Sequence, residues 1–326
     1  MAMKNDKKVF ILIEAVLAVM VLITALLMFL EKNEKRLDKV SVIVQNSDDN
    51  QWSAFSYGLK MAAQDCGLNV FIVNTGAVLT VEDQQRLIEN EIANGADAII
   101  VQPVPGDDTQ AMLKKYKNKI PMMLVECAAS QDTGEAVIPT TLPDNYAMGK
   151  TLAEELLKDY NGNLDGKTLG IVSQTEFSEA AMNREQGFTD MINDTGASIL
   201  WAVYGSSNEN GEILLEGMPK ADLVIALDDD SFTAAGECSA AKNLHGAIIY
   251  GIGNSTEAVY YLDTGFARCL VVPDEFNVGY QSMTEISKSL GNYFNKAQSK
   301  TVSHMVIRRE TLFSKENQDI LFTMSR

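Results

Sequence analysis

The sequence predicts an α/β protein of two doubly wound, Rossmann-like lobes preceded by one N-terminal transmembrane helix. Two observations lead to this prediction. One long apolar run occupies residues 9–30, and after residue 39 short apolar runs alternate with amphipathic segments of helical length. Such alternation is typical of a parallel sheet covered by helices on both faces. It occurs in two sets of domain size that meet near residue 143, which indicates two lobes.

The apolar run, residues 9–30, contains one charged residue, Glu14. A helix of this length would extend roughly 33 Å, at about 1.5 Å per residue, which exceeds the ~30 Å hydrocarbon core of a membrane. A cleaved signal peptide is the alternative, because residues 1–8 are basic. The apolar core of such a peptide spans roughly 7–15 residues and leads to an Ala-x-Ala cleavage pattern. This run is longer and no such pattern follows it, so we expect a permanent anchor followed by a stalk, residues 31–39.

Charge and composition exclude several function classes. The net charge of −17 argues against nucleic acid as a partner, because binding to the phosphate backbone depends on Lys and Arg. The four cysteines share no C-x-x-C spacing, so they indicate neither zinc nor a disulfide framework and are expected to be mostly buried thiols. His245 and His304 are the only histidines, which leaves few choices for a general base near neutral pH. The sequence therefore predicts no enzyme, no metal site and no cofactor.

The first set of elements covers residues 40–143. Four short apolar runs predict strands at residues 40–44, 69–73, 98–101 and 122–125. Amphipathic spacing predicts helices at residues 52–65, 81–93 and 109–116. Gly67 and Gly95 stand where two of these helices should end, since glycine is common just after a helix.

The second set begins after Pro143-Asp144-Asn145. The same reasoning predicts strands at residues 168–172, 199–203, 223–227, 247–250 and 267–272. It predicts helices at residues 146–158, 180–192, 231–242, 256–263 and 276–294. No low-complexity linker separates the two sets.

Polar residues follow the apolar runs, at the positions where a ligand would be expected. In doubly wound sheets ligands bind beyond the carboxyl ends of the strands. The residues at these positions are Gln45 to Asp49, Gln102, Glu126, Ser173, Gln174, Asp228 to Asp230, Asn254 and Asp274. Two lobes that present such ends to each other would form a polar cleft rich in carboxylates. The alternative is that strand ends are polar simply because loops are polar.

Several motifs occur in a characteristic order. They are Asp49-Asn50-Gln51-Trp52 before Gly58-Leu59, the segment Gly95 to Pro103, Ile120-Pro121, Asp144-Asn145 and Arg184-Glu185-Gln186-Gly187-Phe188. This order resembles the type I periplasmic-binding-protein superfamily, in particular the ribose/galactose-type sugar-binding proteins and the ligand cores of LacI-like regulators. The resemblance covers about residues 40–322.

The resemblance implies a type I periplasmic-binding-protein fold, with two lobes joined by a hinge that the chain crosses three times. The first lobe would comprise residues 40–143 plus 274–307, and the second residues 144–273 plus 308–326. The implied ligand-binding residues are Asp49, Gln51, Trp52, Gln102, Glu126, Arg184, Asp228, Asn254 and Asp274.

For Trp52 and Arg184 the resemblance also implies a role. Trp52 would press its ring against an apolar face of the ligand, the alternative being a place in the core. Arg184 would grip ligand oxygens through its fork of donors, the alternative being a surface salt bridge. For Asp229 and Asp230, capping of the following helix is favoured over ligand contact.

Two departures from the sugar-binding pattern bear on the ligand. Glu126-Cys127 stands where the sugar binders place Asp-Arg, and Gly251-Ile252-Gly253 lacks their ligand-binding aspartate. A buried hydroxyl without a partner costs roughly 1–3 kcal/mol. The departures therefore disfavour a simple pentose or hexose, and leave a modified sugar, a polyol or another small polar metabolite.

The resemblance implies a membrane-tethered extracytoplasmic solute-binding protein that closes on a small polar ligand, a carbohydrate or a derivative, for an ABC-type uptake system. The alternative is a sensing subunit that presents the bound solute to a membrane histidine kinase, so the membrane partner is an ABC permease or a sensor kinase. A LacI-type DNA-binding regulator is disfavoured, because residues 1–38 hold the anchor in place of a DNA-reading headpiece. We expect a single-pass cell-membrane protein with residues 1–8 as its cytoplasmic tail and its lobes outside.

Overall fold

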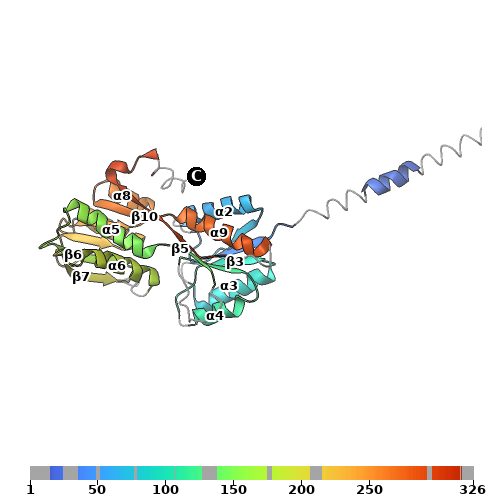
Figure 1. Cartoon of the computed structure of the whole chain (residues 1–326), viewed down its shortest axis with the longest axis horizontal. Coiled ribbons are helices and arrows are strands. Elements are labelled where there is room, and N and C mark those ends of the chain that lie inside the picture. The colour runs from blue at the N-terminus through green and yellow to red at the C-terminus, as the bar shows by residue number, and fades with distance from the viewer. Residues whose placement is uncertain are drawn as a thin grey trace, which may run out of the picture. The chain divides into compact units, whose positions relative to one another are not determined.

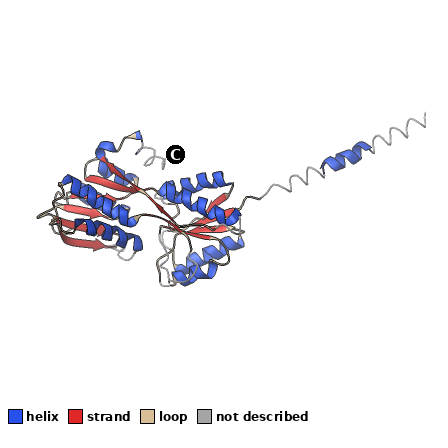
Figure 2. Ribbon diagram, viewed as in Figure 1, coloured by secondary structure: helices blue, strands red, loops and turns tan. Residues whose placement is uncertain are grey.

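The structure is a computed structural model that describes residues 15–24, 36–48, 52–76, 79–106, 108–126, 138–174, 178–205, 215–291, 296–315 and 317 (Figure 1). It divides into two units, Met1–Leu37 and Asp38–Arg326. The second unit contains two six-stranded sheets, each with helices on both faces (Figure 2). We refer to the sheets with their helices as the first and second lobes.

The sheet of the first lobe is parallel, with the strand order β11-β5-β4-β3-β1-β2. Its strands are β1 Lys39–Ile43, β2 Asn69–Ile72, β3 Ala98–Val101, β4 Met122–Val125, β5 Thr140–Pro143 and β11 Lys300–Val302. Its helices are α2 Ser53–Cys66, α3 Val81–Ala93, α4 Thr109–Tyr116 and α9 Glu275–Gly291. Ile100 packs with residues of α2 and α9, while its neighbour Ile99 packs with residues of α3 and α4. Both faces of β3 are thus buried, which explains its unbroken apolar sequence.

The sheet of the second lobe has the order β12-β10-β9-β8-β6-β7 and is parallel except for β12. Its strands are β6 Thr168–Ser173, β7 Ser198–Tyr204, β8 Leu223–Ala226, β9 Ile248–Ile252, β10 Ala267–Pro273 and β12 His304–Arg308. Its helices are α5 Asn145–Asp159, α6 Glu179–Ile192, α7 Asp229–Ala240 and α8 Thr256–Asp263, and a 3-10 turn, Arg309–Thr311, follows β12. The core has the same two layers, one beneath α5 and α6 and one beneath α7 and α8.

The predicted α/β class, the two lobes and the predicted strands and helices are confirmed, with bounds shifted by a few residues. The strands β5, β11 and β12 were not predicted. Each is short: β5 and β11 contain no apolar run, and in β12 only residues 305–307 are apolar. Their strand state comes from pairing with distant segments, which a local pattern does not reveal.

The chain passes between the lobes after Pro143, after Pro273 and at Ser303. The backbone N–H of Asp144 donates to the Val302 carbonyl (3.1 Å), and that of Asp274 donates to the Ser303 carbonyl (3.3 Å), so the three crossings are tied together. The predicted third crossing, between residues 307 and 308, was misplaced. Residues 304–308 form β12, which pairs antiparallel with β10 and so belongs to the second lobe.

A pair of helices in each lobe meets over glycine. At Gly58, α2 lies so close to α9 that a Cβ atom would be 2.0 Å from the Phe276 carbonyl oxygen. At Gly149, α5 lies so close to α6 that a Cβ atom would be 1.8 Å from the Arg184 carbonyl oxygen. Real Cβ atoms essentially never come within 3.0 Å of another atom, so only glycine permits these approaches. They fix the positions of Glu275, beside Phe276, and of Arg184.

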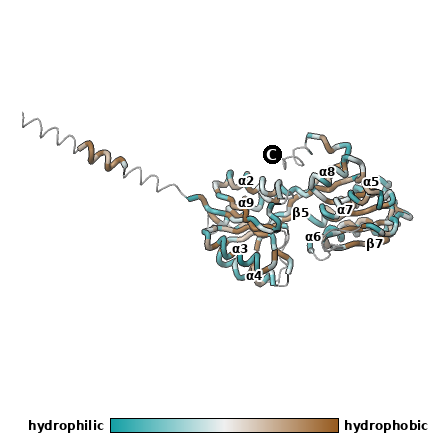
Figure 3. The backbone as a smooth tube through the Cα atoms, turned by 180° about the vertical axis from the view of Figure 1, so that it is seen from behind, coloured by the Kyte–Doolittle hydropathy of each residue, from teal (hydrophilic) through white to brown (hydrophobic). Residues whose placement is uncertain are grey.

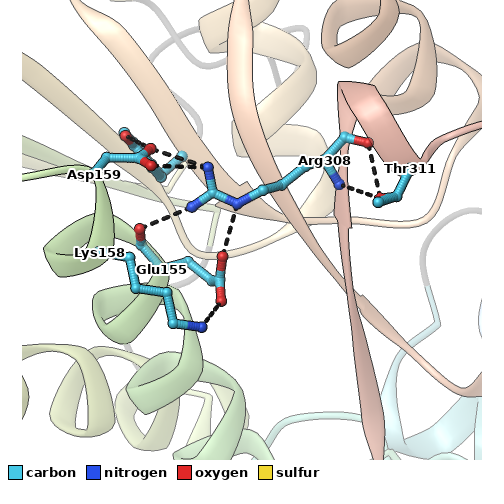
Figure 4. A network of polar contacts seen from close by, with 6 residues as sticks. Glu155, Lys158, Asp159, Arg308 and Thr311 are labelled. Carbon is cyan, nitrogen blue, oxygen red and sulfur yellow. Dashed lines mark hydrogen bonds and ion pairs between the residues drawn. The ribbon is translucent and has the colours of Figure 1, made fainter.

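The last strand, β12, is fastened to the second lobe through Arg308 (Figure 4). Its Nε donates to Glu155 Oε2 (2.8 Å), and its Nη1 donates to both carboxylate oxygens of Asp159 (3.0 and 3.1 Å). Its Nη2 donates to the Glu155 carbonyl oxygen (2.9 Å). Tyr250 donates its hydroxyl to Asp159 from β9. A planar fork of donors suits two carboxylates on one helix, and the network ties β12 to α5.

In the first unit, residues 15–24 form an exposed helical segment of apolar residues, coloured brown in Figure 3. The other residues of the predicted anchor, 9–14 and 25–30, lie outside the described residues, as do the predicted tail 1–8 and residues 31–35 of the stalk. Within the described part of the chain, no helix combines the length and the apolar character needed to pass through a membrane.

Candidate functional site

The polar residues after β1 and β3 are hydrogen-bonded to each other. The side-chain Oε1 of Gln102 accepts from the Gln45 backbone N–H (2.9 Å), and the Gln102 carbonyl accepts from Gln84 Nε2 (2.7 Å). The Trp52 indole N–H donates to the Gln45 carbonyl (2.9 Å). Trp52 is 5% exposed and packs edge-on against Phe55 in the core beneath α2 and α9. Trp52 therefore occupies a core position, the alternative role given for it above. The predicted contact of Trp52 with a ligand remains a prediction.

Two other predicted contacts of the first lobe, Asp49 and Gln51, lie outside the described residues.

Arg184 on α6 joins three elements of the second lobe. Its Nε donates to the Asn145 side-chain oxygen on α5 (2.7 Å), and its Nη1 donates to the carbonyl of Leu227, directly after β8 (3.0 Å). Both acceptors are neutral, so the described contacts are not those of a surface salt bridge. The Asp144-Asn145 motif and Arg184 are thus brought together, and the guanidinium is held at the carboxyl end of the sheet.

Asp228 is the N-cap of α7. The capping role was predicted for Asp229 and Asp230, which follow it, so this prediction was wrong by one or two residues. Asp228 Oδ1 accepts from the backbone N–H of Ser231 (2.9 Å) and from its hydroxyl. Its Oδ2 accepts from the Gln174 backbone N–H (2.7 Å) and from the Ser173 hydroxyl (3.1 Å). The helix begins at residue 229 rather than at the predicted 231, which moves the cap to Asp228.

Asp229 supports the loop that contains Asn254. Its Oδ1 accepts from the backbone N–H groups of Asn254 (2.7 Å) and Ser255 (2.8 Å). Burial raises the pKa of Asp229, and these hydrogen bonds oppose that rise. Asp274 similarly starts α9, where its two oxygens accept from the backbone N–H (3.1 Å) and the side-chain amide (2.6 Å) of Asn277. The ligand contacts predicted for Asp228, Asn254 and Asp274 remain predictions.

Glu126 and Glu275 form a carboxyl pair at the junction of the lobes. Glu126 follows β4 with φ of +64°, in the left-handed region that is costly for a residue with a side chain. Glu275 is the first residue of α9 and is 8% exposed. The two carboxyl groups are in hydrogen-bonding contact, and the charge of Arg184, from the other lobe, acts on both. We refer to Glu126, Glu275 and Arg184 as the junction triad.

Burial raises the pKa of both acids of the junction triad. For Glu275 the negative charge of Glu126 raises it further, to well above the ordinary glutamate value, and Arg184 only partly opposes this. Two carboxylates in contact cannot both ionise easily, so the pair retains a shared proton at a pH where an exposed glutamate is ionised. The resemblance pointed to Glu126 and Arg184, but Glu275 was missed. Its position, after Asp274 at a lobe crossing, was the available signal.

Other reactive groups lie away from the junction triad. Cys238 and Cys269 are buried free thiols, and burial raises the pKa of Cys269 to about 12. Cys66, the last residue of α2, is exposed, so two of the three cysteines in the described part of the chain are buried, as the prediction of mostly buried thiols expects. Among the described residues, no three His, Cys, Asp or Glu side chains converge to hold a metal ion.

Comparison with known proteins connects this geometry to a family. Residues 40–291 match the family described as periplasmic binding protein domain. The galactofuranose-binding protein YtfQ of Escherichia coli (strain K12) is 27% identical over 179 residues, 49% of this chain and 55% of that protein, so the chain spans about half of this relative. A putative rhizopine-binding protein of Rhizobium meliloti is 29% identical over 227 residues, 64% of this chain and 70% of that protein.

A solved structure has the same fold. It is an ABC transporter solute-binding protein from Agrobacterium vitis bound with α-D-tagatopyranose, with a TM-score of 0.73 at 15% identity, and the match covers 87% of this chain and 99% of that chain. The relatives are binding proteins, in agreement with the prediction that this chain is not an enzyme. Because the family match extends from β1 to the end of α9, the chain belongs to the periplasmic binding protein family.

Proposed function

We propose that this chain is an extracytoplasmic solute-binding protein of the ABC-transporter type that closes its two lobes on one small polar ligand, a sugar or sugar-like molecule. The observation that carries the proposal is the junction triad, in which charged groups from both lobes act on one another. A ligand bound there would touch both lobes, so its binding energy would favour the closed arrangement. The sugars and sugar-like solutes in the names of the relatives support this ligand class.

The residues around the triad suit such a ligand. Arg184 is already oriented by Asn145 and Leu227, so little side-chain freedom is lost when it meets a ligand. Acceptors are supplied by the two glutamates, and donors by the guanidinium. Three crossings tied by backbone hydrogen bonds would let the lobes move as rigid bodies about a short hinge.

Thermal stability with and without sugars tests the proposal. The full chain, purified in a mild detergent, would be heated with members of a panel of hexoses, pentoses, polyols and their amino derivatives. A ligand at about 100 times its Kd stabilises the folded state by about 2.7 kcal/mol and raises Tm measurably. Arg184→Lys should remove most of this rise, because lysine retains the charge but not the planar fork. Arg86→Ala, an exposed arginine of α3, is the control and should respond as the wild type does. A panel without any Tm rise would contradict the proposal.

We also propose that residues 9–30 hold the lobes at the membrane, where an ABC permease would receive the solute. Apolarity and length support this. Full-length chain should resist extraction of cell membranes by alkaline carbonate, whereas a chain that begins at residue 38 should be released. Neighbouring genes for a permease and an ATPase would favour uptake, and genes for a histidine kinase and its response regulator would favour the sensing alternative.

A further inference from the structure

The two edges of the first-lobe sheet differ in charge. At the carboxyl edge, the described residues of the loops and first helical turns after β1, β2, β3 and β4 include no lysine or arginine, but five acids: Asp48, Glu82, Asp83, Asp108 and Glu126. At the amino edge, the described residues of the last turns of α2, α3, α4 and α9, and of the loops into the following strands, include six lysines: Lys114, Lys115, Lys117, Lys119, Lys288 and Lys296. We refer to these six as the lysine edge.

The acids of the amino edge are hydrogen-bonded within the lobe. Glu91 is 6% exposed and accepts from the Lys39 ammonium group (2.8 Å) and the Ser41 hydroxyl (2.6 Å). Asp97 accepts from the Lys39 backbone N–H (2.7 Å), and Asp65 accepts from the hydroxyl of Tyr280 (2.9 Å). These contacts reduce the negative charge that the amino edge presents to its surroundings.

The lysines, by contrast, reach solvent. Lys115, Lys119, Lys288 and Lys296 are exposed, and Lys114 and Lys117 are half-buried. Lys115 pairs with Glu89 (3.2 Å) and Lys288 with Glu285 (2.7 Å), and the Nζ atoms of Lys115 and Lys119 each lie 5.1 Å from the centre of the Tyr116 ring. Ion pairs between exposed groups are weak, so these ammonium groups can exchange their partners for anions outside the chain.

The chain enters the first lobe at this same edge. Lys39 is the first residue of β1, and its carbonyl accepts from the Asp97 backbone N–H (2.8 Å). The backbone N–H of Ile99 donates to the Pro121 carbonyl (2.9 Å), so the starts of β1, β3 and β4 lie side by side. Neighbouring strands are about 4.8 Å apart, which places the start of β4 about 10 Å from Lys39 and that of β11 about 20 Å from it.

The apolar run 9–30 therefore precedes the lysine edge by a short distance. The intervening residues, 31–38, can extend at most about 28 Å, at roughly 3.5 Å per residue. When residues 9–30 lie in a membrane, the amino edge of the first lobe is within reach of the lipid headgroups.

We infer that the lysine edge lies on anionic phospholipid headgroups of the membrane that holds residues 9–30, so that the carboxyl edge of the first lobe faces away from the bilayer. The inference rests on the membrane attachment proposed above. Lysines close to an anionic bilayer are attracted to it, and the effect falls off within a Debye length. The acids of the carboxyl edge are repelled by the same lipids, so both edges favour one orientation. A soluble polyanion fits less well, because the tether brings only the headgroups to this edge.

The test is amine acetylation of the full chain in bilayers of phosphatidylcholine alone and of equal parts phosphatidylcholine and phosphatidylglycerol, with peptide mass spectrometry to measure each rate. In the anionic bilayer the six lysines should react at least about threefold more slowly than in the neutral one. Lys150 and Lys242, exposed in the second lobe, should react at the same rate in both. At about 1 M NaCl, where the Debye length is about 3 Å, the protection should disappear.

A variant with four substitutions tests the assignment to these lysines. Lys114→Gln, Lys115→Gln, Lys117→Gln and Lys119→Gln together should remove most of the protection of Lys288 and Lys296. The matched control makes the same change of net charge in the second lobe, through Lys150→Gln, Lys167→Gln, Lys220→Gln and Lys242→Gln, and should retain that protection. Circular dichroism would establish that both variants are folded, and the salt dependence of the wild type needs no variant.

The outcomes separate the inference from the attachment on which it rests. Equal acetylation in neutral and anionic bilayers would overturn the inference and leave the attachment standing. Protection that survives the four substitutions after α4 would show that these lysines do not hold the lobe. If soluble polyphosphate protects the detergent-purified chain as strongly as the anionic bilayer does, the occupant is a soluble polyanion and the inference is wrong. If the full chain enters neither bilayer, the proposed attachment fails and the inference fails with it.

Discussion

At the carboxyl ends of the second-lobe strands, Asp228 and Asp229 are hydrogen-bonded to loops and helix starts of that lobe, whereas Glu126 and Glu275 of the first lobe interact with each other and with Arg184 of the other lobe. The two sheets are built alike, so the fold does not require this difference. It separates acids that hold loops and helix starts in place from acids that are available to a ligand. A carboxylate at a strand end is therefore a candidate ligand contact only when its oxygens are not already hydrogen-bonded to donors of its own lobe.

The largest loss of stability is expected at a feature that the two lobes share, the close helix–helix contacts over glycine. Gly149→Ala should destabilise the protein by about 3 kcal/mol, because its Cβ would meet the Arg184 carbonyl and push α5 from α6. Gly58→Ala, the matched change in the first lobe, should cost a similar amount. Only Gly149→Ala shifts α6, so it alone should displace the Arg184 guanidinium. Chemical denaturation measures the cost. An unchanged unfolding midpoint for either variant would contradict the close approach.

Removal of Arg308 should show how much its hydrogen bonds to the acids of the second lobe contribute to the free energy of unfolding. Arg308→Ala removes the cation that bridges Glu155 and Asp159, leaves Lys158 as the one described cation paired with Glu155 and releases β12, so we expect a loss of about 2–3 kcal/mol. Arg309→Ala, at the neighbouring exposed position, should change stability by less than about 0.5 kcal/mol. Urea unfolding of the two variants gives the comparison, and equal losses would show that the network contributes little.

Asp228 and Glu126 should respond in opposite ways to amide substitution. Asp228→Asn should reduce stability by about 1–2 kcal/mol. The two carboxylate oxygens of Asp228 accept hydrogen bonds from four donors, and the substitution replaces one of these oxygens by an amide nitrogen, which cannot accept. Glu126→Gln should leave the unliganded protein no less stable, since it removes one of two buried carboxyls in contact. Ligand-induced rises in Tm should show the reverse, small losses for Asp228→Asn and large losses for Glu126→Gln. Equal stability losses would remove the contrast between the lobes.

The smallest effect concerns pH. The folded state raises the pKa of Glu275, so its contribution to stability is complete below the ordinary glutamate value of 4.5 and is lost as the pH rises through the raised value. The charged groups that act on it are Glu126, Asp274 and Arg184. Wild type should therefore lose Tm relative to Glu275→Gln as the pH rises above the ordinary glutamate value of 4.5. His304, whose pKa burial lowers, is common to both proteins and cancels in the difference. A difference that does not change with pH would show that folding does not raise the pKa of Glu275.

Local patterns predicted most of the lobes and some of the site. Buried strands such as β3 and β4 are unbroken apolar runs, and amphipathic helices lie between them, so their periodicity is visible in sequence. β12 was placed in the wrong lobe because its pairing with β10 joins segments far apart in the chain. Glu126 and Arg184 were predicted through the resemblance, whereas Glu275 required knowledge of where α9 begins.

The α/β class, the two lobes and the family can be read from the amino-acid order alone, because alternating burial leaves a period in the chain and ordered motifs persist at low identity. Which acids are hydrogen-bonded within their own lobe, and which interact across the lobes, depends on the folded arrangement. Asp228, Asp229 and Glu275 all follow or begin elements in the same manner, and their partners come from distant loops and helices. Hydrogen bonding and charge interaction act over a few ångströms in space, and spacing along the chain does not record those distances.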